Sequence, residues 1–213
     1  MADPNRRFGL AAVALPILLL AMSGLARATV ITVNTLDSGS DSAPLCTLED
    51  AVTAANNQAV QNGCLAGSGN DTIVFAVTGT IFATLGPTGT LSIIGPVGGG
   101  ITISGAAATG TIIFVAETNL TLKNLTLADG TDLFGGAIID EAAHLEVENC
   151  TFVGNTAIGP ERSGGGAGGA IFLDGGTATI INSTFANNSA PSGSFNGMPQ
   201  TGIGAPSLAT TIL

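Results

Sequence analysis

The chain repeats one short pattern three times, and this repetition constrains its fold more than any other feature. Residues 120–130 read LTLKNLTLADG, residues 145–155 read LEVENCTFVGN, and residues 178–188 read ATIINSTFANN. One aligned position holds asparagine and another, three residues later, holds a large apolar residue: Asn124, Asn149 and Asn182, then Leu127, Phe152 and Phe185. Self-similarity at a period of about 20–35 residues is typical of a solenoid.

A second motif, GGAI, is interleaved with the first at residues 135–138 and again at 168–171. Paired glycines suit a tight bend where a Cβ atom would clash with neighbouring backbone. We therefore assign structural roles to these four glycines: Gly135, Gly136, Gly168 and Gly169.

The composition favours many short strands joined by glycine-containing turns. Of 213 residues, 45% are hydrophobic and only 9% are charged, which is too apolar for a disordered chain. The 31 glycines are too many for a helical bundle. From residue 71 onward, most short segments alternate apolar and polar residues, so each strand has one buried face.

The repeat length is too long for a hairpin and too short for a strand–helix–strand unit. Parallel stacking of successive coils accommodates it, since each strand then pairs with its equivalent in the next turn. We predict an all-β, single-stranded, right-handed parallel β-helix of five or six coils with one short N-terminal helix. The repeated asparagines would occupy a turn, and the repeated apolar residues would stack inside.

The first 28 residues are predicted to be a signal peptide. Arg6 and Arg7 precede an apolar run, and Ala26-Arg27-Ala28 has small residues at both ends. An uncleaved membrane anchor is the alternative. Cleavage removes three arginines and one aspartate, which changes the net charge from −10 to −12. Such an acidic chain is a poor partner for nucleic acid or anionic lipid.

Residues 29–70 are predicted to form a strand, a polar loop and a capping helix. Residues 46–60, CTLEDAVTAANNQAV, change to a helical period, with Thr47 as the N-cap and an end near Asn62-Gly63. Cys46 and Cys64 are expected to form a disulfide, as in exported proteins. Buried free thiols are the alternative. If Cys46 and Cys64 pair, Cys150 remains as a buried free cysteine.

Two motifs resemble known families of surface proteins. GGAI followed by FxxN, at 152–155 and 185–188, resembles the repeat of polymorphic outer membrane proteins. The segment CTLEDAVTAAN resembles the CSLREA module of bacterial right-handed β-helix surface proteins, although its usual arginine is absent. The resemblance implies a pectin-lyase-like solenoid that is secreted or held at the outer membrane surface and is sometimes adhesive. Residues 71–213 would be its coils, with an incomplete C-terminal end.

The sequence offers few residues for the catalysis that this fold performs elsewhere. A uronate lyase needs cations, and only Lys123 and Arg162 follow the leader. Lys123 is expected to be a solvated outward side chain. The carboxylate pairs Asp129/Asp132 and Asp140/Glu141 are expected at turns, and His144 is the single histidine. We therefore predict no catalytic, cofactor-binding or metal-binding residues.

Residues 67–73, GSGNDTI, match one copy of a calcium-binding nonapeptide, so weak calcium binding stays open. The first hypothesis is a non-enzymatic, exported, adhesin-like scaffold whose ligand is unknown, with carbohydrate or protein as candidates. A polysaccharide-active enzyme, or its inactive remnant, is the alternative. A calcium-stabilised structural module is the third.

Overall fold

The computed structural model describes residues 28–39, 43–107, 110–159, 167–190 and the backbone of 201–203. The predicted signal peptide, apart from Ala28, lies outside these residues. So do Arg162, with most of the loop that contains it, and the C-terminal residues after 203.

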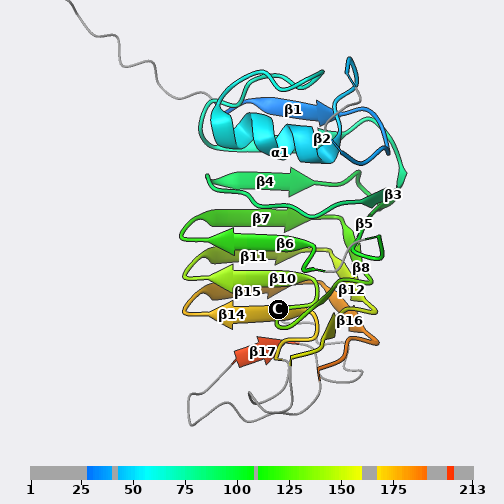
Figure 1. Ribbon diagram of the computed structural model, residues 1–213, viewed down its shortest axis with the longest axis vertical. Helices are drawn as coiled ribbons and strands as arrows, with labels where there is room; N and C mark the ends of the chain where they lie inside the picture. The colour runs from blue at the N-terminus through cyan, green and yellow to red at the C-terminus, as the bar shows by residue number, and fades with distance from the viewer. Residues whose placement is uncertain (1–27, 40–42, 108–109, 160–166, 191–200, 204–213) are drawn as a thin grey trace, which may run out of the picture.

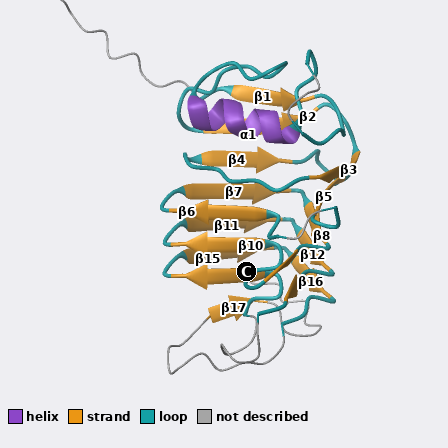
Figure 2. Cartoon of the chain, in the orientation of Figure 1, coloured by secondary structure: helices purple, strands orange, loops and turns teal. Residues whose placement is uncertain are grey.

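One helix and seventeen strands make up the described chain (Figures 1 and 2). Their bounds in chain order are β1 Val30–Val33, α1 Leu48–Asn57, β2 Asp71–Phe75, β3 Gly79–Phe82, β4 Leu91–Ile94, β5 Ile101–Ser104, β6 Ile113–Ala116, β7 Asn119–Lys123, β8 Thr126–Ala128, β9 Thr131–Asp132, β10 Ile138–Glu141, β11 His144–Glu148, β12 Thr151–Val153, β13 Thr156–Ala157, β14 Ile171–Asp174, β15 Thr177–Ile181, β16 Thr184–Ala186 and β17 Thr201–Ile203.

The strands form three larger parallel sheets, which the chain visits in turn. The first sheet has the order β1-β2-β4-β7-β11-β15, the second β3-β5-β8-β12-β16, and the third β6-β10-β14 with β17 added antiparallel. A short parallel pair, β9 and β13, follows the second sheet. Figure 1 shows the strands of each sheet piled along the long axis of the molecule. This mostly β architecture with parallel sheets is compatible with a parallel β-helix.

The register of the sheets follows the sequence repeats. Leu120 pairs with Leu145, and Leu145 with Ala178, so the first residues of each repeat lie side by side. The GGAI motifs do the same, because Ile138 pairs with Ile171. Successive equivalents are thus strand neighbours, and the inward-facing residues of the three larger sheets form one buried core.

The repeated apolar position forms a column in this interior. Phe152 pairs in register with Leu127 on one side and with Phe185 on the other. The rings of Phe152 and Phe185 stack with centroids 4.7 Å apart and planes 2° from parallel. Burying a side chain of this size contributes about 1.5–3 kcal/mol through water exclusion alone.

Helix α1 packs against β1 and β2 at the N-terminal end of the stack (Figure 2). The Thr47 hydroxyl accepts a hydrogen bond from the Asp50 amide at 3.1 Å, as an N-cap does. The predicted helix was too long at its C-terminal end. It ends at Asn57 because Gln58 adopts a left-handed backbone, and its amide donates back to the Ala54 and Ala55 carbonyls.

The last residue of the stretch predicted to be helical is not part of the core. Val60 lies beyond the helix, and its side chain is 69% exposed. The segment beyond the helix is held by a disulfide between Cys46 and Cys64. Within the described ranges, no helix is both long and apolar enough to cross a membrane.

Candidate functional site

The three repeated asparagines lie in the turn between the first and second sheets. Asn124, Asn149 and Asn182 have φ values of 56°, 54° and 48°, a left-handed backbone that asparagine tolerates better than most residues. The Asn149 amide group donates to Asn124 Oδ1 at 3.4 Å, and Asn124 donates to the Gly95 carbonyl at 3.3 Å. The side chains of Asn124 and Asn149 therefore connect neighbouring turns between the two sheets.

The glycines of the two GGAI motifs lie where the backbone passes close to itself. Gly135 and Gly168 have φ values of 55° and 68°, and a Cβ atom on either would lie 2.2 Å from a carbonyl oxygen. A Cβ on Gly136 would lie 2.4 Å from the carbonyl oxygen of Gly169, the equivalent glycine of the second GGAI motif. These four positions therefore accept no larger residue without local rearrangement.

Two further asparagines, Asn155 and Asn188, form a buried column that sequence reasoning did not assign a role. The Asn155 amide group donates to the Leu127 carbonyl, and that of Asn188 donates to the Phe152 carbonyl, both at 3.0 Å. Asn155 Oδ1 also accepts from the Gly130 amide at 2.9 Å. The FxxN motif thus places asparagines where they satisfy backbone groups of the preceding strand of the second sheet.

Lys123 was expected to be a solvated side chain, but it is ion-paired and about one-third exposed. Its ammonium lies 2.7 Å from Glu148 and 3.5 Å from Glu146, both on the neighbouring strand β11. The hydrogen bond to Glu148 raises the pKa of Lys123, burial opposes this rise, and attraction to both carboxylates adds to it. Ion pairs at the protein surface contribute little to stability. Here they hold the Lys123 ammonium against the outer face of the first sheet.

The expected positions of the acidic pairs were partly wrong. Asp129 occupies a turn, with φ 58°, whereas Asp132 lies in β9 and Asp140 and Glu141 lie in β10. The prediction was wrong because two adjacent acidic residues are typical of a turn. In β10 they are instead strand residues, with Asp140 facing the interior and Glu141 facing the surface. Asp140 points inward, in register with Val115 and Leu173.

Asp140 is the one fully buried carboxyl with an unpartnered oxygen among the described residues. Its Oδ1 accepts from the Ala143 amide at 2.8 Å, and its Oδ2 has no hydrogen-bond partner. Burial raises the pKa of Asp140, opposed by the Ala143 amide and by nearby His144. His144 is exposed, and its Nδ1 lies 2.8 Å from the Thr177 hydroxyl, so it does not form a catalytic group with Asp140 in this geometry.

The glycine-rich segment before β2 is organised around Asp71. The carboxylate of Asp71 accepts from the backbone amides of Thr29, Ser68 and Gly69, at 3.0–3.3 Å. These bonds tie the turn to the start of the first sheet. In the part of the chain that the structure describes, no cluster of three or more metal-binding side chains is found.

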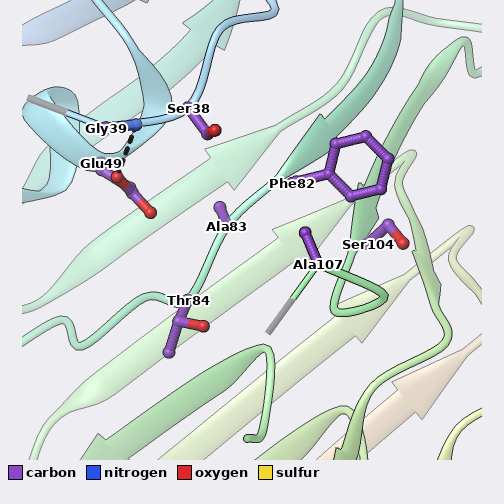
Figure 3. Close-up of a pocket in the computed structure, with 8 residues that line it drawn as sticks. All are labelled: Ser38, Gly39, Glu49, Phe82, Ala83, Thr84, Ser104 and Ala107. Atoms are coloured by element: carbon purple, nitrogen blue, oxygen red, sulfur yellow. Dashed lines mark hydrogen bonds between the residues drawn. The ribbon is translucent and has the colours of Figure 1, made fainter. Parts of the chain in front are cut away.

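The hollow shown in Figure 3 has a volume of about 260 Å³ and lies between the N-terminal loop and the second sheet. Figure 3 shows Gly39 and Glu49 on one side, where the Gly39 amide donates to Glu49 at 2.8 Å. Phe82 and Ser104 lie on the other side, from β3 and β5. Its walls combine one aromatic ring, hydroxyl groups and a carboxylate that already has a backbone donor.

Comparisons of the chain with protein-family models, with curated proteins and with solved structures found no match.

Proposed function

We propose that this chain is an exported, non-enzymatic scaffold, built as a right-handed parallel β-helix, that presents a surface in an adhesin-like manner. The observation that carries the proposal is the way its repeated polar groups are used. The asparagines at 124 and 149, like those at 155 and 188, bond from coil to coil rather than toward a common point. Polar residues that bond to their own equivalents stabilise the stack of strands, which is the role expected of a scaffold.

Right-handedness is supported by the topology. Nearly all parallel strand-to-strand crossovers within a sheet are right-handed, because of the twist of the strands. Every pairing in the first two sheets is parallel, with each strand returning after one circuit of the chain.

Export is supported by the disulfide between Cys46 and Cys64, which closes the segment around α1. Disulfides persist in oxidising compartments and are rare in reducing ones. The segment predicted to be a signal peptide agrees with the same destination, the cell surface or the medium. A surface location also suits a protein of strongly negative net charge, which repels other acidic polymers.

The location is tested by expressing the full chain in a bacterial host, fractionating the cells, and trapping thiols with a polyethylene-glycol maleimide. We expect the processed protein outside the cytoplasm, with one trapped thiol after denaturation. A cytoplasmic protein that traps three thiols would contradict the proposal.

The absence of catalysis is tested separately with purified protein on pectins and polygalacturonate. Neither new reducing ends nor unsaturated uronates are expected. Turnover of either kind would instead support a polysaccharide-active enzyme. Calcium titration by calorimetry tests the third hypothesis, since heat of binding that is lost on chelation would favour a calcium-stabilised module.

A further inference from the structure

The outward face of the second sheet carries one threonine on every strand, in register. Thr102 pairs with Thr80 and Thr126, and Thr151 pairs with Thr126 and Thr184. We call these five residues the threonine row. Each is exposed or partly exposed. Because neighbouring strands lie about 4.7–4.9 Å apart, the row offers hydroxyl groups at a constant spacing along the molecule.

The hydroxyl groups of the threonine row make no hydrogen bond to any described residue. Two threonines on the first sheet differ, since Thr121 donates to Glu146 at 3.4 Å and Thr177 contacts His144 at 2.8 Å. The row therefore keeps both its donors and its acceptors for solvent or a ligand.

The strand residues of this face carry no charge, whereas the carboxylates of Asp129, after β8, and Glu49, in the hollow beside Phe82, lie at its border. The column beside the threonine row consists of Phe82, Ser104, Ala128, Val153 and Ala186. Ser104 and Ala128 are buried, so this column is open only at its two ends. The outward face of the first sheet, by contrast, bears Lys123, Glu146 and Glu148. On a chain of formal charge −10, a neutral sheet face is suited to a neutral partner.

A groove borders the threonine row where its strands begin. Its volume is about 560 Å³, and Thr126 and Thr151 form part of its lining together with Asn124 and Asn149. The segment 97–100 forms the other part, and its Val97 side chain is 98% exposed. The groove thus adds amide groups to the hydroxyl groups of the row, with an apolar residue at its edge.

The opposite ends of these strands offer an aromatic ring. Phe82 is 43% exposed and lines the hollow of Figure 3 with Ser104. Binding sites for small uncharged groups combine an apolar or aromatic surface with a few placed polar groups. The groove and the threonine row therefore form a neutral surface, and the exposed ring lies at the far end of its strands, in a hollow that also contains Glu49.

We propose that this face binds a neutral polysaccharide, with the threonine row and the groove amides bonding to sugar hydroxyls and Phe82 packing on a sugar ring. The proposal rests on the scaffold function above and names its ligand class. Sugar hydroxyls both donate and accept, as the row does. A groove edged by the exposed Val97 and a hollow lined by Phe82 suit a polymer chain better than a flat crystalline lattice. Uronate polymers are disfavoured because the protein is acidic.

The test is affinity electrophoresis of the full, disulfide-bonded protein in gels that contain glucomannan, barley β-glucan, dextran or polygalacturonate. We expect retardation by at least one neutral polymer and none by polygalacturonate. The double variant Thr126→Val/Thr151→Val removes two hydroxyls and keeps the β-branched shape, so retardation should fall at least tenfold. Thr179→Val is the matched control, because Thr179 is an exposed threonine on β15 of the first sheet. Phe82→Ala should also reduce the retardation, independently of the threonine hydroxyls.

Thermal unfolding of each variant verifies that the fold is kept. Failure of every neutral polymer to retard the protein would overturn the proposal, as would undiminished binding by the double variant or equal binding of polygalacturonate. The proposal would also be overturned if the protein bound ice or associated with itself and the double variant did not. The face would then belong to another partner. None of these results would affect the location and thiol measurements that test the scaffold function itself.

Discussion

Asp140 shows how one side chain departs from the pattern of its column. Its partners in register, Val115 and Leu173, are apolar, whereas Asp140 brings a carboxyl group with one unbonded oxygen into the interior. A buried polar atom without a partner costs about 1–3 kcal/mol. The charged form of this carboxyl is therefore a local weakness of the third sheet.

Burial raises the pKa of Asp140 above its ordinary value of 3.8. The protonated carboxyl is therefore favoured in the folded protein, and this stabilisation is complete below pH 3.8. It is lost as the pH rises through the pKa of the folded state. Asp140→Asn does not titrate, so its stability advantage over the parent should grow from pH 3.5 to pH 7, by about 1–3 kcal/mol. Denaturant unfolding at both pH values measures this change.

Asp174→Asn is the control for Asp140→Asn, since it removes the same charge from an exposed position on β14. Its advantage should stay constant between the two pH values. If Asp140→Asn showed the same constant difference, the buried carboxyl would not be the source of the effect.

Cys150 is a buried free thiol whose reactivity should be very low in the folded protein. Burial raises the pKa of the Cys150 thiol to about 11, so the reactive thiolate is scarce at pH 8. We expect no reaction with Ellman's reagent in native protein and one thiol per chain in denaturant. Rapid labelling of the native protein would show that Cys150 is accessible.

At the scale of the element, the turn between the first and second sheets depends on its asparagines. Asn149→Ala should lose about 1–2 kcal/mol, because a left-handed backbone is unfavourable for a residue with an ordinary Cβ. Asn149→Gly relieves that strain while removing the same side-chain bond to Asn124. Chemical unfolding of both variants separates the two contributions, and equal losses would show that the side-chain bond dominates.

The helix and the strands differ in how well the sequence predicts them. Alternation and repetition identify the strands, because the same residues recur at the same place in each coil. The end of α1 is missed because a left-handed Gln58 stops the helix, and glutamine carries no strong signal for such a stop. Val60 then extends the apolar pattern past the true end.

The sequence repeats contain enough information to predict part of the threonine row and the unusual position of Asp140. A threonine precedes each of Leu127, Phe152 and Phe185, which already places three members of the threonine row. Alignment of the GGAI motifs likewise sets Asp140 opposite Leu173. The free state of the hydroxyls and the groove beside them depend on the three-dimensional packing of loops, which no spacing in the sequence encodes.

At the scale of the whole molecule, the account depends on coils that stack in one register. The interior columns and the asparagine bonds all require that equivalent residues of successive repeats be strand neighbours. The neutral face requires the same, since a slip of one residue would turn the threonine row into the core. A measurement of this register therefore tests the fold and the binding proposal together.

Cysteine pairs in the threonine row give that measurement, in a Cys150→Ser background that matches Ser183 in the equivalent position. With a short bis-methanethiosulfonate cross-linker, the pair Thr126→Cys/Thr151→Cys should link within one chain, because the two residues lie on adjacent strands. The pair Thr126→Cys/Thr184→Cys should stay unlinked, since two strand spacings separate them by about 10 Å. Failure of the first pair, or equal linking of both, would contradict the stacked register.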